Sequence, residues 1–406
     1  MGFADTSQLV FPWDVLTPLA QLARQHPDGI VDLSVGTPID PTPQVIQSAL
    51  TRAADAHGYP LTYGTSEVRE AISAWFARRR HSVVDPRDVL PTVGSKELVG
   101  LLPSLLGLGE GDIVVHPDVA YPTYDVGARL AGATPFPASD VEQWQGNPNV
   151  KLVWINSPGN PHGGVLSVEQ LQQIVAAARR LGALVVSDEC YAELPWQEPY
   201  VSQGVPSVLD PRVCGDSYEG VLVTYSLSKQ SNVAGYRAAF VAGDQSVVAR
   251  LLEIRKHLGL IVPFPVQAAM TAAVQDDQHV SEQRARYAQR RGVLLRGLET
   301  AGLHVDESAA GLYLWVRADD AFESALTEQS RVLVENARSV LPGKCWSTVA
   351  FLAQLGILVA PGIFYGSAGG GHVRVALTAD DERISTAAMR LESQARQKLS
   401  PFVTIT

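Results

Sequence analysis

Short apolar segments alternate with longer amphipathic segments between residues 86 and 245, and this alternation constrains the fold more than any other feature of the chain. The short segments are rich in β-branched residues and have the length of buried strands, whereas the segments between them are typical of helices. Connections of that length join parallel strands. The pattern therefore predicts an α/β protein with a mostly parallel sheet covered by helices on both faces. The predicted strands include 112–115, 152–155, 184–187 and 221–225.

The composition is that of a globular protein with an excess of acidic residues. Of the 406 residues, 46% are hydrophobic and 18% are charged, which is enough apolar material for two or three domains. The net charge of −10 disfavours nucleic acid and anionic membranes as partners. The chain shows no secretory signal, no apolar run of roughly 20 residues and no cysteine spacing typical of disulfides or zinc. These features predict a soluble cytoplasmic protein without a metal site.

Lys229 stands in the loop SLSK, directly after the predicted strand 221–225. A lysine that a buried strand delivers into a serine-rich loop is poorly placed to be a surface lysine. Such a lysine can form a Schiff base with an aldehyde. Ser226 and Arg237 flank it and are candidate ligands for the phosphate of an aldehyde cofactor. The alternative is an ordinary loop lysine.

Other polar residues follow the predicted strands or open the predicted helices. Gly94-Ser95-Lys96 open a helix, where free N–H groups and the positive end of the helix dipole suit a phosphate. Asn160 lies in the rigid loop NSPGNPHGG, where its amide could donate to a ring substituent or serve as a turn residue. Asp188 ends a buried strand, where its carboxylate needs a partner, either a helix N-terminus or a cationic ring nitrogen.

Three more residues are candidates for ligand binding, each with a structural alternative. Tyr121 could stack on a planar ring, although packing is the usual role of a tyrosine. Gly36 lies in a turn that could let the backbone approach a ligand, or it is an ordinary turn glycine. Arg374 interrupts the apolar strand 372–377, where it pairs with a carboxylate of the protein or binds one on a substrate.

The order of these residues along the chain resembles that in the class I and II aminotransferases, which are pyridoxal-phosphate enzymes of fold type I. Three motifs carry the resemblance, which extends over almost the whole chain: SLSK with an arginine eight residues after the lysine, NxPxNPxG, and DECY. Two residues depart from the family pattern. His162 stands where threonine is usual, and Lys96 stands where small or polar residues are commoner.

The resemblance implies a large domain with a mostly parallel seven-stranded sheet flanked by helices, and a smaller α/β domain built from the N- and C-terminal parts. Residues 1–45 are then an N-terminal arm and part of the small domain, 46–285 the large cofactor-binding domain, and 286–406 the C-terminal small domain. Within the last of these, the polar segment 318–348 shows no clear pattern of helix or strand.

The resemblance also implies a role for each candidate residue. Lys229 would hold pyridoxal 5′-phosphate as a Schiff base and then move a proton. Asp188 would pair with the ring nitrogen, and Asn160 and Tyr191 would bond the phenolic oxygen of the ring. Tyr121 would stack on the ring. The residues implied to bind the phosphate are Gly94, Ser95, Lys96, Ser226 and Arg237.

Two further roles concern the substrate and the oligomer. Arg374 would bind the α-carboxylate of the amino acid, with Gly36 and Asn160 beside it. Tyr59 would reach the phosphate from a neighbouring subunit, which implies a homodimer with shared active sites.

Longer motifs resemble the actinobacterial N-succinyldiaminopimelate aminotransferases of lysine and diaminopimelate synthesis. Among these motifs are HPDGIVDLSVGTPIDP, AYPTYDVGARLAGA, AGLYLW and ILVAPGIFYG. This resemblance implies ping-pong transfer of an amino group between glutamate and N-succinyl-2-amino-6-oxopimelate, with 2-oxoglutarate and N-succinyl-L,L-2,6-diaminopimelate as products.

Four alternatives stay open at this point. An aminotransferase of another amino acid and a C–S β-lyase would use the same cofactor. A cofactor-binding transcription regulator usually carries a basic DNA-binding domain, and none is visible here. A nucleotide-binding enzyme could use the GSK loop, but the chain lacks GxxxxGK[ST] and a GxGxxG after a strand.

Overall fold

The computed structural model describes residues 12–306 and 308–399. The expectation that the N-terminus carries no secretory signal concerns residues 1–11 and lies outside the described residues, as does the first part of the predicted arm. Within the described ranges, no helix combines the length and the apolar character that a bilayer crossing requires. All three cysteines are buried and unbridged.

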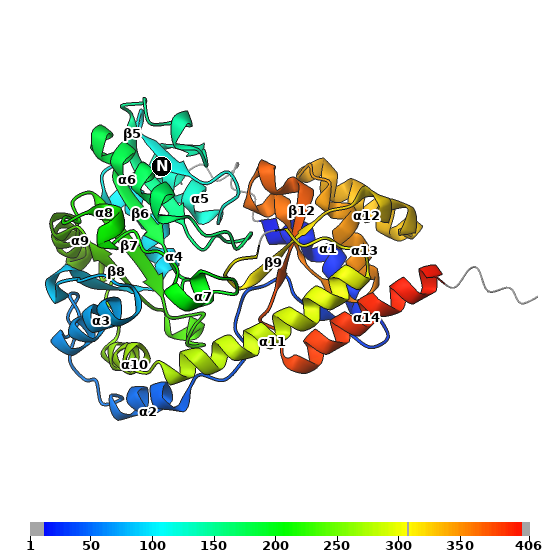
Figure 1. Ribbon diagram of the computed structural model, residues 1–406, viewed down its shortest axis with the longest axis horizontal. Helices are drawn as coiled ribbons and strands as arrows, with labels where there is room; N and C mark the ends of the chain where they lie inside the picture. The colour runs from blue at the N-terminus through cyan, green and yellow to red at the C-terminus, as the bar shows by residue number, and fades with distance from the viewer. Residues whose placement is uncertain (1–11, 307, 400–406) are drawn as a thin grey trace, which may run out of the picture.

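Seven strands form the central sheet, in the order β2-β8-β7-β6-β5-β3-β4 (Figure 1). β8 is antiparallel to both of its neighbours, and the other pairs are parallel. The predicted fold class is therefore confirmed. The strands are β2 (Val89–Val93), β3 (Ile113–His116), β4 (Thr134–Pro137), β5 (Val150–Asn156), β6 (Leu184–Asp188), β7 (Val221–Ser226) and β8 (Ala238–Gly243).

Side chains of the central strands alternate between two hydrophobic cores, one on each face of the sheet. In β5, Leu152 and Trp154 belong to one core, whereas Val153 and Ile155 belong to the other. The first core is closed by α4 (Ser95–Leu105), α5 (Thr123–Leu130) and α9 (Gln245–Leu258). The second is closed by α3 (Ser66–Arg79), α6 (Val168–Leu181) and α10 (Phe264–Gln275), and α10 also contacts α2 (Gln44–Arg52).

Residues from both terminal parts of the described chain form a second α/β unit with its own core. A three-stranded antiparallel sheet has the order β11-β12-β9, and β1 pairs with β10 in a separate parallel ribbon. These strands are β1 (Val31–Asp32), β9 (Tyr313–Arg317), β10 (Ile357–Leu358), β11 (Ala360–Pro361) and β12 (His372–Ala376). The helices that pack on them are α1 (Pro12–Arg24), α12 (Glu328–Val340), α13 (Cys345–Gln354) and α14 (Asp381–Leu399).

The long helix α11 (Gln278–Thr300) runs from the α10 side of the large unit to the second unit, where it packs against α14 (Figure 1). The N-terminal residues from α1 to β1 thus lie with the C-terminal part of the chain. Domain boundaries at residues 45 and 285 stay predictions.

Several segments differ from the sequence-based expectation. The segment 318–348 forms a 3₁₀ turn (Asp320–Ala325), α12 and the start of α13. β4 was not predicted because its sequence, TPFP, holds two prolines; it lies at the edge of the sheet, where proline is tolerated. Within residues 304–306, Val305 makes a single bridge to Val316.

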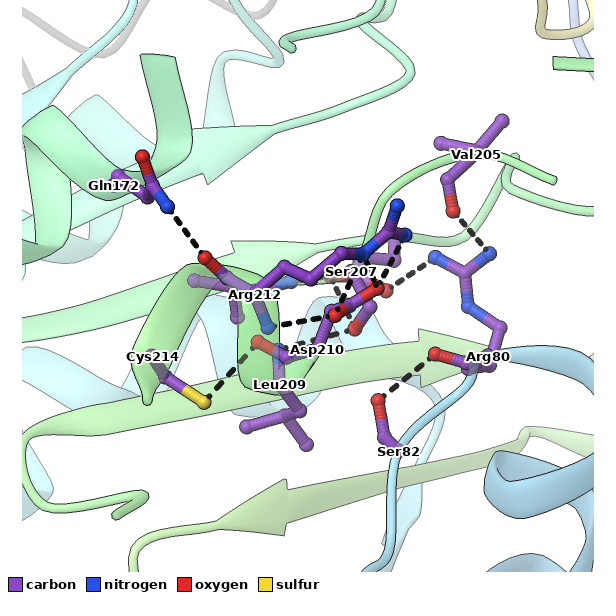
Figure 2. Close-up of polar contacts among 11 residues, drawn as sticks. Arg80, Ser82, Gln172, Val205, Ser207, Leu209, Asp210, Arg212 and Cys214 are labelled. Atoms are coloured by element: carbon purple, nitrogen blue, oxygen red, sulfur yellow. Dashed lines mark hydrogen bonds and ion pairs between the residues drawn. The ribbon is translucent and has the colours of Figure 1, made fainter. Parts of the chain in front are cut away.

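The segment 193–219 contains the short helices α7 (Tyr200–Gln203) and α8 (Pro211–Cys214). Figure 2 shows how side chains hold α8: the Asp210 carboxylate accepts from the N–H of Arg212 at 2.8 Å, and Gln172 of α6 donates to the Arg212 carbonyl at 2.6 Å. Helices of one turn have no apolar period that a sequence could reveal.

Candidate active site

The carboxyl ends of β5, β6 and β7 bring polar residues side by side. Asn156, Asp188 and Thr224 are direct neighbours in the register of the sheet. In open α/β sheets, ligands bind outside the carboxyl ends of the strands. This edge is therefore where a site is expected.

Asp188 is 7% exposed and is held by two neutral groups. Its Oδ2 accepts a hydrogen bond from the Tyr124 hydroxyl at 2.9 Å, and its Oδ1 accepts one from the Cys190 N–H at 3.2 Å. Burial raises the pKa of the Asp188 carboxyl. A cation beside this carboxyl would stabilise its charged form.

Two aromatic rings pack against Tyr124, the tyrosine that contacts Asp188. The Tyr124 ring stacks on Trp154 of β5, with centroids 5.0 Å apart. Tyr121 stands edge-on to Tyr124 at 5.9 Å, and the Lys96 ammonium lies 5.9 Å from the centroid of the Tyr121 ring. Tyr121 is half-buried, so its ring is accessible to a planar group.

The first turn of α4 meets Arg237 at the same end of the molecule. Gly94 precedes the helix with φ of 75° and offers no capping side chain, so the first N–H groups are open to an anion. A Cβ on Gly94 would overlap Nη2 of Arg237, so only glycine lets the guanidinium approach the helix start. The Cys190 thiol lies 3.7 Å from the Ser95 hydroxyl and against the backbone of Ser226. Four predicted phosphate ligands are therefore close together: Gly94, Ser95, Ser226 and Arg237.

Lys229 is half-buried, and its amine donates a hydrogen bond to the carbonyl of Gly36. The segment that holds Gly36 is tied to the second unit, because Ala376 N–H donates to the Leu33 carbonyl at 2.8 Å. The structure thus brings together two predicted site residues that are 193 positions apart.

Arg374 is 4% exposed and contacts Asn160, another predicted site residue. Its Nη1 donates to Asn160 Oδ1 at 3.1 Å, and its Nη2 donates to the Ser34 carbonyl at 2.6 Å. Its Nε is buried and has no hydrogen-bond partner within the described residues. A carboxylate is the ligand that such a buried guanidinium best accommodates.

Tyr191 meets a tyrosine from β9. The hydroxyl oxygens of Tyr191 and Tyr313 are 3.3 Å apart. Burial raises the pKa of Tyr191 well above that of an ordinary tyrosine, so this phenol keeps its proton and can donate it in a hydrogen bond.

The fold of a single chain does not bring Tyr59 to the other predicted site residues. Its side chain is fully exposed, at 101% of the reference area, in a loop that also exposes Leu61 at 65%. His162, the departure from the family loop, accepts the N–H of Gly164 at 3.0 Å and packs on Gly159. The loop therefore keeps its turns with histidine in place of threonine.

Three functional candidates were missed by sequence reasoning: Tyr124, Asn156 and Tyr313. Asn156 Nδ2 donates to the Asp188 carbonyl at 3.0 Å, and its Oδ1 accepts the Asn160 N–H at 2.8 Å, so it joins two strand ends. Asn156 could have been found as the last residue of a strand. The hydroxyl contacts of the two tyrosines carry no signal in the sequence.

The residues present fit a planar cofactor with an aldehyde, a ring nitrogen and a phosphate. Asp188 is a buried carboxyl with neutral partners, as the ring nitrogen requires. The uncapped start of α4 beside Arg237 suits the phosphate. Lys229 precedes Arg237 by eight residues and is the amine that an aldehyde needs.

The family model for aminotransferase class I and II matches residues 28–391. The 4-dedimethylamino-4-oxo-anhydrotetracycline transaminase OxyQ of Streptomyces rimosus is 51% identical over 381 residues, covering 94% of this chain and 98% of that protein. The probable aminotransferase Rv1178 of Mycobacterium tuberculosis is also 51% identical, over 391 residues, covering 96% and 87%. The solved structure of a probable N-succinyldiaminopimelate aminotransferase from Thermus thermophilus superimposes with a TM-score of 0.79 at 26% identity, covering 94% and 100%.

The predicted family is confirmed by these matches. The names of the two relatives at 51% identity do not include N-succinyldiaminopimelate, so that substrate stays a prediction. By its sequence, its fold and its match over residues 28–391, the chain belongs to the class I and II aminotransferases, a family of pyridoxal-phosphate-dependent enzymes.

Proposed function

We propose that this aminotransferase moves an amino group between glutamate and N-succinyl-2-amino-6-oxopimelate, in the synthesis of diaminopimelate and lysine. The observation that supports amino-acid chemistry at the carboxyl edge of the sheet is a chain of hydrogen bonds that links Arg374 through Asn160 and Asn156 to Asp188. The charges of Lys229 and Arg374 both act on the Tyr313 phenol. The choice of substrate is supported by the sequence motifs and by the solved structure of a protein named as a probable N-succinyldiaminopimelate aminotransferase.

Pyridoxal phosphate, when bound, supplies an aldehyde that accepts the amino group and a cationic ring that withdraws electrons from it. Asp188 would hold that ring nitrogen in its protonated form, an attraction of about 4 kcal/mol at 4 Å and an effective dielectric near 20. Asn160 and Tyr191 would donate to the phenolic oxygen. Gly94, Ser95, Ser226 and Arg237 would hold the phosphate, with Lys96 adding positive charge nearby.

Arg374 would bind the α-carboxylate of the substrate and so direct Cα toward the lysine. Its free Nε supports this role, because a carboxylate would satisfy a buried donor. Lys229 would then act as the base that removes the Cα proton and as the acid that returns one. The Gly36 carbonyl, which accepts a hydrogen bond from the lysine amine, would orient it.

We also propose that the enzyme is a homodimer in which Tyr59 completes the phosphate site of the partner. The full exposure of Tyr59 supports this, as does the exposed apolar surface around it. The Leu61 carbonyl accepts from Gln267, so the Tyr59 loop adjoins α10, whose first residue, Phe264, is 41% exposed. Tyr59→Phe should weaken cofactor binding without dissociating the dimer, and an active monomer would contradict the proposal.

A cytoplasmic location remains part of the proposal. The three cysteines are buried and unpaired, which suits a reducing compartment. Cell fractionation with a tagged chain tests this.

The substrate is tested with the purified, cofactor-loaded enzyme. The enzyme is given 2-oxoglutarate and a panel of amino donors that includes N-succinyl-L,L-2,6-diaminopimelate, and glutamate formation is measured. We expect that donor to give the highest kcat/KM. Lys229→Ala should lose both the yellow absorbance of the bound cofactor and all transfer, and a fully active variant would end the assignment of this lysine.

A second candidate is an aminotransferase that acts on a bulky cyclic ketone. The 51% identity to OxyQ, whose name states such a substrate, favours it. Glutamate-dependent amination of a polycyclic ketone, with no turnover of N-succinyldiaminopimelate, would support this reading. Release of pyruvate and ammonia from a sulfur-containing amino acid would instead indicate a C–S β-lyase.

A further inference from the structure

Tyr313 begins β9, and its hydroxyl reaches the centre of the candidate site. The residue is 4% exposed, and the Arg374 guanidinium lies 3.9 Å from the centroid of its ring. Its hydroxyl oxygen is 3.3 Å from that of Tyr191. A Cβ on Gly36 would overlap this hydroxyl, so glycine at position 36 is the residue that leaves room for the phenol. Tyr313 therefore touches the carboxylate-binding arginine and the tyrosine that faces the cofactor.

The positive charges of Arg374 and Lys229 act on the Tyr313 phenol. Burial opposes its ionisation, but the positive charges of Arg374 and Lys229 outweigh burial and hold its pKa below that of an ordinary tyrosine. Burial raises the pKa of Tyr191. A hydroxyl has one proton, so if Tyr191 donates its proton to the cofactor, Tyr313 must be the donor in the hydrogen bond between the two hydroxyls. The titratable groups that face Tyr313 are Lys229, Tyr191, Tyr287, Tyr365 and Arg374.

We propose that Tyr313 is a positioning residue that donates to Tyr191 and so directs the Tyr191 hydroxyl to the phenolic oxygen of pyridoxal phosphate. The proposal rests on the role proposed above for Tyr191. Hydrogen bonds in such a chain polarise one another, so the first strengthens the second. A stronger donor at the phenolic oxygen stabilises the negative charge that this oxygen carries when the Schiff base of Lys229 is unprotonated. Tyr313 therefore lowers the pH at which that Schiff base loses its proton.

The test is an absorbance titration of the cofactor-loaded enzyme without substrate, comparing the wild type with Tyr313→Phe. The substitution keeps the ring against Arg374 and removes only the hydroxyl. We expect the midpoint of the Schiff-base band to rise by about half a pH unit. Cooperativity supplies part of the energy of the charge-assisted hydrogen bond from Tyr191, and this part is lost with the Tyr313 hydroxyl. An unchanged midpoint overturns the proposal.

Tyr365→Phe is the matched control. This tyrosine also faces the Arg374 guanidinium, at 5.0 Å, and its buried hydroxyl has no hydrogen-bond partner in the described part of the chain. Its midpoint should equal that of the wild type. An equal rise in Tyr365→Phe would mean that any hydroxyl near Arg374 has the same effect, which also overturns the proposal.

A double variant separates the relay from a direct effect on Lys229. In a Tyr191→Phe background, Tyr313→Phe should cause no further rise, because the hydroxyl that it addresses is gone. A rise of the same size in that background overturns the relay. If the wild type forms no titrating band with pyridoxal phosphate, the role of Lys229 itself is wrong, and that failure is distinct from an unshifted midpoint.

Discussion

Asp188 and Glu189 are adjacent buried carboxylates at the end of β6, and they differ in what holds them. Glu189 is 1% exposed and accepts from Arg80 Nη2 at 2.7 Å, from the Ser207 hydroxyl at 3.0 Å and from the Val208 N–H at 2.9 Å. Asp188 accepts only neutral donors, from Tyr124 and Cys190, among the hydrogen bonds of the described residues.

The difference separates a structural carboxylate from one that awaits a ligand. Arg80 supplies the positive charge for Glu189 from within the chain and is itself fixed by the Val205 carbonyl at 2.9 Å (Figure 2). Burying a charge is costly unless the charge is paired, and Glu189 is paired. Asp188 accepts hydrogen bonds from neutral groups but has no cation beside it among the described residues. A cationic ring nitrogen would supply that charge partner.

The sharpest way to break this comparison is Asp188→Asn, which keeps the shape and removes the charge. If Asp188 holds the cofactor ring in its cationic form, the loss is about 4 kcal/mol, or about a thousandfold in kcat/KM. Steady-state kinetics at saturating cofactor measures it. Wild-type kcat/KM in this variant would show that the carboxylate serves the fold and not the chemistry.

Arg80→Met tests the other half of the comparison. The side chains of Arg80 and Glu189 are both 1% exposed, so the variant leaves the buried Glu189 carboxylate without its cationic partner. We expect the free energy of unfolding to fall by about 3–5 kcal/mol, with kcat/KM of the folded enzyme little changed. Urea unfolding measures the first and kinetics the second.

Arg87→Met is the control for this prediction. Arg87 pairs with Asp85 at 2.8 Å, but its side chain is 71% exposed. Exposed pairs contribute little to stability, so this variant should unfold like the wild type. If Arg80→Met proved no less stable than Arg87→Met, the distinction drawn between the two carboxylates would fail.

The sequence predicts the carboxylate but not its partners. Asp188 was identified because it ends an apolar strand, and the end of a short apolar run is a local feature of the sequence. The charge partner of Glu189 is Arg80, 109 residues away, and this pairing depends on how α3 packs under the sheet. The sequence does not show which of Tyr121 and Tyr124 contacts Asp188, because the start of α5 determines which ring points toward that carboxylate.

The same limit explains what was missed in the second unit. β9 spans Tyr313–Arg317, but nothing local in the sequence reveals that Tyr313 meets Tyr191. That contact requires the β11-β12-β9 sheet to dock on the carboxyl edge of the central sheet. Arg374 was found because an arginine among apolar strand residues is rare in any context.

Tyr124→Phe sharpens the comparison on the Asp188 side. The variant removes one of two hydrogen bonds to the carboxylate but keeps the ring stacked on Trp154. A hydrogen bond to a charged group contributes about 1.5 kcal/mol at the low end, so kcat/KM should fall about tenfold. Tyr218→Phe, which loses a bond to the Val83 carbonyl, is the control and should keep its activity. An equal loss in both variants would deny Tyr124 a special role.

The smallest effect concerns pH and the enzyme without cofactor. Burial raises the pKa of Asp188 above its ordinary value of 3.8. An acid with a raised pKa in the folded state stabilises the fold fully below its unfolded value, and this contribution is lost as pH rises through the folded pKa. Asparagine does not titrate, so Asp188→Asn should gain stability relative to the wild type as pH rises above 3.8. Urea unfolding of the two cofactor-free proteins across this range measures the difference, and a difference that stays flat with pH would mean that Asp188 already has a charge partner in the folded chain.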